Sequence, residues 1–396
     1  MITSDADAPV LKVCEFYSGI GGYHIALSQI LKLTYKVVAA FEISSNANCI
    51  YRANFPHTPV LETNLCGLTA ARLNSIIKKA GDRPAGDVVK SRDENMTSRD
   101  EHERPCDEVM FVMSPPCQPF TRQGSRKDDL DPRSASVIHL FGIFSQLPSL
   151  PDYFFLENVQ GFEGSNTRNK IMEFFTQHRY HVVEFLINSN ELGIPNSRLR
   201  YYLLARRQPF SAKIKADLDR SDLLSFIPGY ENSSITPPLS KFLETDPAGY
   251  QLSEKFLSKW GRVLDLVTPA STRSCCFTKG YGVKAEGSGS VIQQAPDDTN
   301  SCAITPEKHA PSDLTDHRTD NERSVCSSKL EGEEFLKHMK SLNLRFFTPR
   351  EIARIHGIPE WYEFPDSLSQ KQLYKLLGNG LNVTVVKQLI ERVLLN

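Results

Sequence analysis

Short apolar runs alternate with longer amphipathic stretches over the first half of the chain. The runs predict strands at residues 10–17, 36–42, 108–113, 153–156 and 201–205, and the stretches predict helices at 23–33 and 46–54. Strands separated by helices indicate an α/β fold with a parallel sheet covered on both faces. Such sheets bind ligands beyond the carboxyl ends of their strands. We therefore look for functional residues at those strand ends.

Two segments, residues 82–104 and 295–333, do not share this pattern. Both are polar, with too little apolar content to offset the entropy of ordering, so we predict exposed and mobile loops. From residue 208 to 340 the alternation is lost, which predicts a smaller second domain. Order returns at 347–351, where Thr348 is predicted to cap a helix that begins at Pro349. The predicted parts are therefore 1–207, 208–340 and 341–396.

Composition restricts the class of protein. The 396 residues carry 46 basic and 47 acidic side chains, so a nucleic acid would need a local basic face. The polar start at residues 1–7 is unlike a signal peptide, and no apolar stretch reaches bilayer-spanning length. Nine cysteines without C-x-x-C pairs indicate a reducing compartment and no structural zinc site. We expect a cytoplasmic protein, with the nucleus as a second location, and neither a metal nor a membrane partner.

One cysteine is held between prolines directly after the apolar run at residues 109–113. Pro115, Pro116 and Pro119 restrict the backbone around Cys117, so its thiol has few available positions. A fixed thiol at the end of a predicted strand suits a nucleophile. A small buried cysteine in a tight turn is the alternative. We favour the nucleophile because three further features agree with it.

A glycine-rich turn, Phe16-Tyr17-Ser18-Gly19-Ile20-Gly21-Gly22, closes the first predicted strand and opens a helix. Glycines permit a tight turn and close approach of the backbone to a ligand, although many such turns need glycine for geometry only. Glu42 ends the next strand about 20 residues later, where a carboxylate can accept both ribose hydroxyls. The pair predicts a nucleoside cofactor. His24 replaces the third glycine of the dinucleotide fingerprint, which counts against NAD.

Two further strand ends carry charged groups. Glu157 follows the apolar run at 153–156, where it either pairs within a loop or shares a proton with a substrate ring nitrogen. Arg198 and Arg200 lie two residues apart in a β-like run and so on one face, where they can hold an anionic backbone or a base carbonyl. Two exposed arginines on an edge strand are the alternative.

Four segments, in this order, resemble the motifs of the cytosine C5-methyltransferases: residues 16–22, Pro115-Pro116-Cys117, Glu157-Asn158-Val159 and Arg198-Leu199-Arg200. A fifth, residues 372–379, resembles the last motif of that family, which returns to the catalytic domain and completes the cofactor pocket. Within the family, the chain is most similar to the tRNA aspartic acid methyltransferases, also called DNA methyltransferase homologue two. The segments that carry this similarity are residues 54–58, 192–201 and 276–282.

The resemblance implies a Rossmann-like S-adenosylmethionine-dependent methyltransferase domain, with residues 208–340 as target-recognition domain. It implies S-adenosyl-L-methionine as methyl donor and a cytosine in the anticodon loop of tRNA, cytosine 38 of the aspartic acid tRNA, as substrate. The implied cofactor residues are Phe16, Ser18, Gly19, Ile20, Gly21, Gly22, Glu42, Ile43, Leu65, Cys66, Ser114, Asn379 and Gly380. The implied substrate residues are Cys276, Phe277, Thr278, Lys279 and Tyr281. Gly380 and Lys284 depart from the serine and tyrosine usual in the family, which puts one cofactor contact and one substrate contact in question.

The expected chemistry assigns a role to each catalytic group. The Cys117 thiolate would add to C6 of cytosine, and Glu157 would protonate or hydrogen-bond N3 to relieve the charge on the ring. Arg198 would orient the base and Arg200 support that arrangement, although the sequence does not rank the two. The general base that removes the C5 proton is not identified. Phe277 and Tyr281 would offer stacking faces and Lys279 a phosphate contact; a buried Phe277 and a merely solvated Lys279 are the alternative.

Two other functions remain open at this stage. A DNA cytosine methyltransferase uses the same catalytic groups, so DNA is the alternative partner to tRNA. A catalytically silent nucleic-acid adaptor that binds the cofactor is a rival of another class, but it would need neither Cys117 nor Glu157. We expect a monomer, although nothing in the sequence fixes the oligomeric state.

Overall fold

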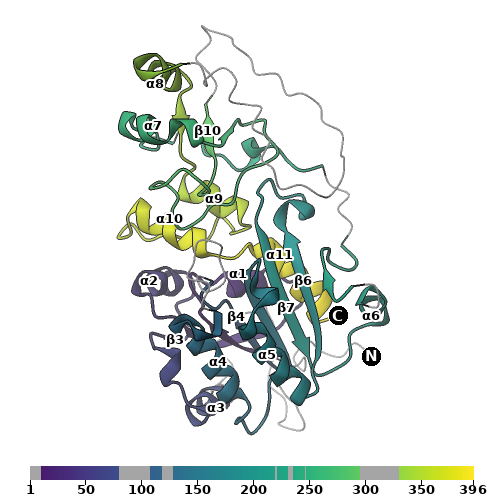
Figure 1. Cartoon of the computed structure of the whole chain (residues 1–396). Coiled ribbons are helices and arrows are strands. Elements are labelled where there is room, and N and C mark those ends of the chain that lie inside the picture. The colour runs from purple at the N-terminus through teal and green to yellow at the C-terminus, as the bar shows by residue number, and fades with distance from the viewer. Residues whose placement is uncertain are drawn as a thin grey trace, which may run out of the picture.

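A large twisted sheet organises the chain in this computed structural model, which describes residues 10–79, 108–117, 128–218, 221–230, 235–245, 247–294 and 330–396 (Figure 1). The predicted loop at 82–104 and residues 295–329 of the second one lie outside these ranges. The sheet has eight strands in the order β3-β2-β1-β4-β5-β7-β6-β8. Their bounds are β1 Leu11–Phe16, β2 Tyr35–Phe41, β3 Val60–Leu61, β4 Val109–Met113, β5 Tyr153–Val159, β6 His181–Asn188, β7 Leu199–Arg206 and β8 Leu223–Leu224.

The predicted α/β fold is confirmed, with one departure from a parallel sheet. Strands β3, β2, β1, β4 and β5 run parallel to one another. Strand β7 lies between β5 and β6 and is antiparallel to both. Residues 189–198 join β6 to β7 through a short 3-10 turn at Ser189–Leu192. A parallel pair needs a crossover of a dozen or more residues, so this short connection imposes the antiparallel pairing. The sequence predicted β7 but neither β6 nor β8.

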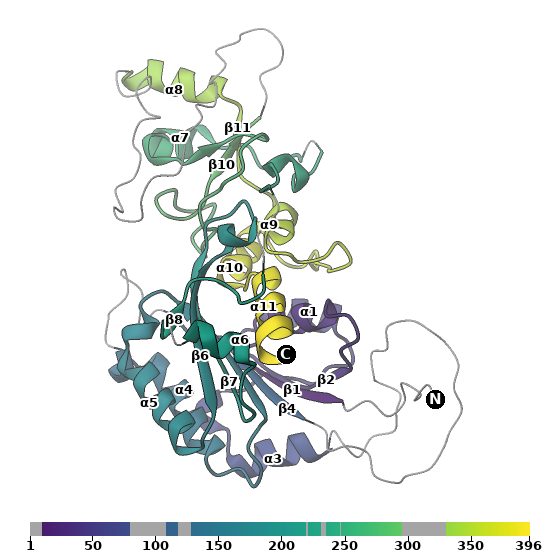
Figure 2. The same cartoon turned by 90° about the vertical axis from the view of Figure 1, so that its right-hand side faces the viewer.

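Helices cover both faces of the sheet (Figure 2). One face packs against α1 (Gly22–Ser28), α2 (Ser45–Asn54) and α11 (Val383–Leu389). The other face packs against α3 (Ala70–Lys79), α4 (Pro132–Phe144) and α5 (Asn166–Gln177). This second core is rich in phenylalanine: Phe16 stacks on Phe41 with ring centroids 5.0 Å apart, and Phe111 contacts Phe16 edge-on at 5.3 Å. Both strand faces are therefore apolar, as expected for a parallel sheet.

The chain order reverses between the neighbouring strands β1 and β4. Their carboxyl ends lead into the glycine-rich turn and into the Cys117 segment respectively. Glu42 follows β2, and Glu157 lies near the end of β5. Ligands of α/β sheets bind at such a switch point, so the topology gathers the predicted site residues at one edge of the sheet.

A smaller unit projects from that edge (Figure 1). It contains the three-stranded sheet β11-β10-β9, formed by β9 (Leu266–Val267), β10 (Val291–Gln293) and β11 (Leu344–Arg345). It also contains α7 (Glu254–Trp260) and α8 (Gly332–Ser341), whose apolar side chains Leu257, Phe335 and Met339 share one core. Because α8 begins at Gly332, the end of the predicted loop at 295–333 is helical.

Both predicted boundaries of the smaller domain need correction. After α6 (Ala212–Leu218), β8 pairs with β6, so the chain belongs to the large sheet up to Leu224. At the other end, β11 pairs with β10 in the small sheet, so the returning segment starts after Arg345 rather than at residue 341. Strands of two residues leave no periodic pattern in the sequence, which is why the boundaries were misplaced.

The last part of the chain packs back onto the large sheet. The Thr348 hydroxyl oxygen caps α9 (Pro349–Ile355) by accepting from the Glu351 amide, and the Glu351 carboxylate accepts from the Thr348 amide in return, which confirms the predicted cap. α10 (Gln370–Asn379) and α11 follow. Leu381 packs directly on Gly22: a Cβ at position 22 would lie 3.0 Å from the Leu381 side chain. No helix in the described ranges is long and apolar enough to cross a membrane.

Candidate active site

The segment that carries Cys117 is fixed by neighbours on both sides of the sheet edge. The Asn158 side-chain amide donates to the Pro115 carbonyl at 3.2 Å, and the Tyr23 hydroxyl donates to the Met113 carbonyl at 2.9 Å. The Ser114 hydroxyl in turn donates to the Tyr23 oxygen at 3.4 Å. The Cys117 side chain is half-buried at the end of this segment. The bonds to Met113 and Pro115 therefore fix the backbone that leads to Cys117.

The groups around Cys117 shift the pKa of its thiol in opposite directions. Burial raises the pKa of the Cys117 thiol, and the nearby Glu157 carboxylate raises it further. The positive charges of Arg200 and Lys279 act against this rise in pKa. The effect of burial prevails, and the pKa of Cys117 lies above its ordinary value. Cys117 is therefore a neutral thiol at pH 7.

Glu157 and Arg200 form a buried ion pair beside that thiol. Arg200 Nε lies 3.4 Å from Glu157 Oε1, and the exposed fractions of the two side chains are 15% and 11%. The antiparallel register that pairs Val159 with Arg200 brings the two side chains together. Burial raises the pKa of the Glu157 carboxyl, against the opposing charges of Arg200 and Arg198. Glu157 is thus shifted toward the protonated form that a general acid needs.

Arg198 does not have the position expected of a group that orients the base. Its guanidinium is 3% exposed and donates to the Phe277 carbonyl at 3.3 Å and to Cys276 Sγ at 3.2 Å. It also donates to the carbonyls of Gly378 at 3.4 Å and Gly380 at 2.5 Å. These bonds engage both terminal nitrogens of the guanidinium, so Arg198 holds chain segments together, while its buried Nε has no partner among the described residues. Arg200 is the arginine that faces Glu157 and the thiol, which separates the roles of two residues that the sequence did not rank.

The predicted cofactor turn is tied to the end of β2 by Glu42. Glu42 Oε2 accepts a hydrogen bond from the Gly19 amide at 3.0 Å, and Oε1 accepts one from the Ser44 amide at 2.8 Å. Gly19 and Gly21 adopt positive φ angles of 54° and 82°, which glycine tolerates without a steric penalty. Each carboxylate oxygen retains further acceptor capacity for a ligand. The turn and the carboxylate therefore form one preorganised unit.

Two features of this unit fit a bound nucleoside. The hydroxyl of Ser18 is buried and has no hydrogen-bond partner among the described residues. Buried polar groups are rarely left in that condition, so a ligand atom would satisfy it. Ile43 is a large apolar side chain with 67% exposure, directly after Glu42, where it can cover an apolar ligand face. Ser18 and Ile43 therefore suit a bound nucleoside.

Several predicted cofactor residues cannot offer their side chains. Phe16, Ile20 and Leu65 are at most 6% exposed and belong to the cores, so only their main chains can reach a ligand. Gly21 and Gly22 are also buried, whereas Cys66 and Asn379 are exposed and Ser114 and Gly380 are half-buried. A Cβ at Gly380 would lie 3.2 Å from the Leu377 carbonyl, so the serine usual in the family would need a small shift here.

The segment from Cys276 to Gly282 is packed against α10, which corrects its predicted role. Phe277 and Tyr281 are 1% and 2% exposed and contact each other edge-on, with ring centroids 5.0 Å apart. Neither can offer a stacking face to a nucleic acid. The half-buried Thr278 lies so close to Gly378 that a Cβ there would be 2.2 Å from its carbonyl carbon. Lys279 is exposed, and its charge reaches Cys117. Lys284, two residues after this segment, is exposed as well.

Two supporting residues were not assigned a role from the sequence. Tyr23 and Asn158 hold the Cys117 segment by its backbone, as described above. Asn158 stands next to Glu157 in a strand-end motif, and its polar side chain at a buried position was the available signal. Tyr23 gave no comparable signal, because an aromatic residue at a helix start is more often part of a core. Tyr23 is 1% exposed, so its ring belongs to the core while its hydroxyl holds the Cys117 segment.

Comparison with known proteins agrees with this geometry. The model of the C-5 cytosine-specific DNA methylase family matches residues 63–394. The chain belongs to this family. It is similar to the human tRNA (cytosine(38)-C(5))-methyltransferase, with 34% identity over 96% of this chain and 98% of the human protein. It is also similar to a DNA (cytosine-5)-methyltransferase of Dictyostelium discoideum, with 29% identity over 96% of this chain and 93% of that protein.

A solved structure supports the same assignment of fold. The crystal structure of a mutant of Spodoptera frugiperda DNMT2 has a TM-score of 0.71 and 34% sequence identity, covering 96% of this chain and 98% of that one. The predicted membership of the cytosine C5-methyltransferases is thus confirmed, and the protein is an enzyme of this type.

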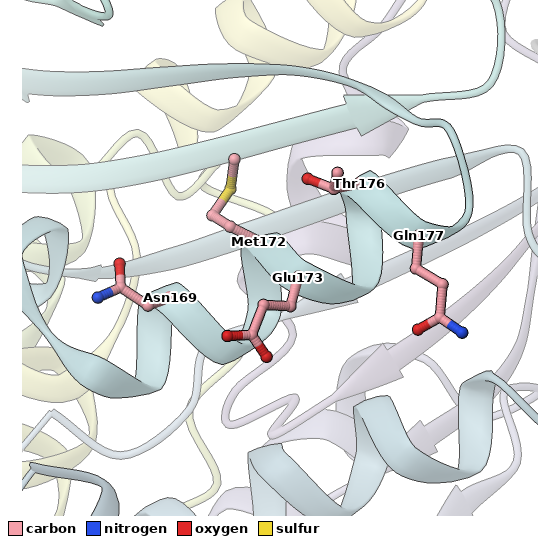
Figure 3. Close-up of a pocket in the computed structure, with 5 residues that line it drawn as sticks. All are labelled: Asn169, Met172, Glu173, Thr176 and Gln177. Atoms are coloured by element: carbon pink, nitrogen blue, oxygen red, sulfur yellow. The ribbon is translucent and has the colours of Figure 1, made fainter.

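A hollow on the surface of α5 lies apart from these groups (Figure 3). It is lined by Asn169, Met172, Glu173, Thr176 and Gln177, none of which belongs to the predicted site. Within the described ranges, no cluster of three His, Cys, Asp or Glu side chains could hold a metal ion.

The opposing effects on Cys117 predict how its alkylation depends on pH. Because its pKa is raised, the rate of reaction with iodoacetamide should reach half its maximum above the ordinary thiol value of about 8.5. Lys279→Ala removes a charge that lowers the pKa and should move the midpoint to still higher pH. Lys284→Ala is the matched control and should leave it in place. Mass spectrometry of the Cys117 peptide provides the rates, and a midpoint below the ordinary value would contradict this reading of the site.

Proposed function

We propose that the protein transfers a methyl group to C5 of a cytosine in the anticodon loop of tRNA. The placement of Arg200 carries this proposal, because it joins Glu157 to the surroundings of the Cys117 thiol at the switch point of the sheet. Cytosine 38 is the position named in the human relative, and it is the position we propose here. A base in a loop is also easier to extrude into a site than one stacked in a duplex.

Cys117 begins the reaction in this proposal. C5 of cytosine is a weak nucleophile, and a bond between Cys117 Sγ and C6 makes it enamine-like. Since the thiol is neutral in the free enzyme, its proton must leave as the base arrives. Arg200 and Lys279 stabilise the thiolate that results. After C5 has taken the methyl group, loss of the C5 proton to water expels the sulfur as a thiolate, which takes up a proton to restore the thiol.

Glu157 acts on the other side of the ring. Its raised pKa lets it donate a proton, or a strong hydrogen bond, to N3 as negative charge develops there. Arg200 holds the Glu157 carboxyl in place through the 3.4 Å contact. Arg198 takes no direct part, because it is 3% exposed and its two terminal nitrogens are bound to backbone carbonyls. It acts by fixing the strand from which Arg200 extends.

The methyl group comes from S-adenosylmethionine, whose positively charged sulfonium makes the methyl carbon electrophilic. Glu42 would accept the ribose hydroxyls, Ser18 would gain the partner that its buried hydroxyl lacks, and Ile43 would cover the adenine. Ser114 and Asn379 lie on the neighbouring segments that would complete the pocket. Together these residues would bring the methyl donor to the edge that also carries Cys117.

DNA is the second candidate substrate, because the Dictyostelium relative is named as a DNA methyltransferase. Both substrates would use the same catalytic groups. We favour tRNA because the identity to the human tRNA enzyme is higher, at 34% against 29%. In either case Lys279 is exposed beside the thiol, where it can contact a backbone phosphate.

The covalent step predicts a specific loss. Cys117→Ala should abolish methyl transfer to tRNA and leave binding of S-adenosylmethionine nearly unchanged, because the thiol acts on the base. With 5-fluorocytosine in the target tRNA, the wild type should form a stable adduct, because fluorine cannot leave as a proton does. Cys49→Ala, a half-buried cysteine on α2, is the control and should keep full activity. Measurable transfer by the Cys117 variant would rule out the covalent mechanism.

Substitution of Glu42 and substitution of Glu157 should have different effects. Glu42→Ala should weaken cofactor binding by about 1–3 kcal/mol, the range for removal of a charged hydrogen-bond partner. Glu157→Gln should keep that affinity and lower the turnover rate by roughly 100-fold or more, because an amide cannot act as a general acid. Glu173→Gln, an exposed carboxyl on α5, is the matched control. Calorimetry and single-turnover rates with the opposite pattern would mean that the roles are exchanged.

A further inference from the structure

Cys276 lies against the two buried arginines at the start of β7. Its Sγ accepts a hydrogen bond from Arg198 Nη1 at 3.2 Å and another from Arg200 Nη2 at 3.8 Å. A neutral thiol would instead donate to the Phe277 carbonyl, 3.7 Å away, which already accepts from Arg198 at 3.3 Å. A neutral thiol sulfur is only a weak acceptor. Two cationic donors on one sulfur therefore favour the thiolate.

The pKa of Cys276 is shifted in the direction that these contacts imply. Burial raises the pKa of this thiol, but the charges of Arg198 and Arg200 and the hydrogen bonds from them outweigh burial, so the pKa lies below its ordinary value. The adjacent Cys275 differs, because burial and the carboxylate of Asp265 raise the pKa of its thiol to about 11. The two neighbouring thiols therefore lose their protons in different pH ranges.

Arg200 is shared between Cys276 and Glu157. Its Nε lies 3.4 Å from Glu157 Oε1, while its Nη2 donates to Cys276 Sγ. Burial lowers the pKa of the Arg200 guanidinium, but the charge of Cys276 and, to a smaller extent, the charge of Glu157 raise it above its ordinary value. Cys276 is thus the stronger of these two charged partners of Arg200.

Other titratable groups beside the arginines and Glu157 do not supply a negative charge. They include Tyr23, Tyr202, Cys117 and His356. Burial raises the pKa of both tyrosines and of Cys117, and it lowers the pKa of His356, so all four are neutral at pH 7. Within this set of described residues, Glu157 and Cys276 are the two that can balance the arginines as anions.

We propose that the Cys276 thiolate is the counter-ion of Arg198 and Arg200, and that it thereby allows Glu157 to hold the proton that it donates to cytosine N3. A buried arginine next to a carboxyl group favours the ionised carboxylate. With the sulfur as counter-ion, the charge of Arg200 stays balanced when Glu157 is neutral. Cys276 acts through Arg200 and is a positioning residue. The inference rests on the proposed role of Glu157 as general acid.

The first measurement determines the pH at which the Cys276 thiol ionises. Alkylation by iodoacetamide is followed in Cys275→Ser, so that the peptide read by mass spectrometry carries one thiol. The rate should reach half its maximum below the ordinary thiol value of about 8.5. In Cys276→Ser, the remaining Cys275 thiol should reach its midpoint near 11. This measurement needs neither cofactor nor tRNA.

The second measurement determines the pKa of Glu157 in the wild type and in Cys276→Ser. The side-chain carboxyl signals of ¹³C-labelled glutamate are followed by NMR, and Glu157→Gln identifies the signal. Loss of the thiolate leaves Glu157 as the anion that balances Arg200, so its pKa should fall by about one pH unit or more. The alkaline limb of the single-turnover rate should move to lower pH in parallel, while the affinity for S-adenosylmethionine stays unchanged.

Two variants separate the charge from a general loss of structure. Cys276→Asp supplies a carboxylate that can accept from both arginines, so it should restore the pKa of Glu157 toward the wild-type value. Cys275→Ser changes the adjacent thiol, which is coupled to Asp265 rather than to the arginines. It should leave both the pKa of Glu157 and the pH profile of the rate unchanged.

Two results would overturn the role of Cys276. One is an alkylation midpoint of Cys276 at or above the ordinary thiol value, which would mean that the sulfur is neutral. The other is an unchanged pKa of Glu157 in Cys276→Ser, which would mean that the sulfur does not act on the carboxyl. Failure of the proposed function looks different: full turnover by Glu157→Gln would reject the general acid and would alter neither pKa measurement.

Discussion

The buried guanidinium of Arg198 joins three parts of the chain that are far apart in sequence. It binds carbonyls in the segment that follows Cys276 and at the end of α10, while its own backbone leads into β7. Burying a charge is costly unless it is hydrogen-bonded, and the two terminal nitrogens of Arg198 find their carbonyl partners only when these segments meet in one arrangement. The position of β7 depends on that arrangement. Arg200, two residues further along, then extends from β7 toward Glu157 and the thiol.

Burial is the second constraint, and it sets the protonation of the reacting groups. It raises the pKa of both Cys117 and Glu157. For Glu157 the shift is useful, because the group must hold a proton to give to the base. For Cys117 it is a cost, which the charges of Arg200 and Lys279 reduce. Arg200 thus lowers the pKa of both groups, which helps to form the thiolate but opposes protonation of Glu157, and substrate binding has to complete the activation of the thiol.

The sequence predicted most of the groups that meet at the sheet edge. Cys117, Glu157 and Glu42 each follow or end a strongly apolar run, and parallel strands bring such ends together. It did not rank Arg198 and Arg200, because residues two apart share a face whatever each one contacts. Only the tertiary structure shows that Arg198 is enclosed by carbonyls. The sequence also gave no sign of the hydrogen bond between the hydroxyls of Tyr17 and Ser136, whose oxygens lie 2.8 Å apart across 119 positions of the chain.

The prediction of stacking faces at Phe277 and Tyr281 was wrong for a different reason. Aromatic residues beside glycines suit a stacking surface, but they suit a core equally well, and here they fill the space beneath α10. The domain boundaries failed because β8 and β11 are two residues long. In contrast, the cap at Thr348 was predictable, because it depends on local hydrogen bonds alone. Sequence patterns thus predicted local structure and strand ends well, and long-range partners poorly.

The measurement that tests the central claim most directly compares the two candidate nucleic acids. The enzyme is supplied with labelled S-adenosylmethionine and either total tRNA or genomic DNA, and the labelled cytosines are mapped by bisulfite sequencing. The account predicts label at C5 of a single anticodon-loop cytosine in tRNA, and little or none in DNA. Equal or faster labelling of DNA would contradict the tRNA assignment and favour a DNA cytosine methyltransferase.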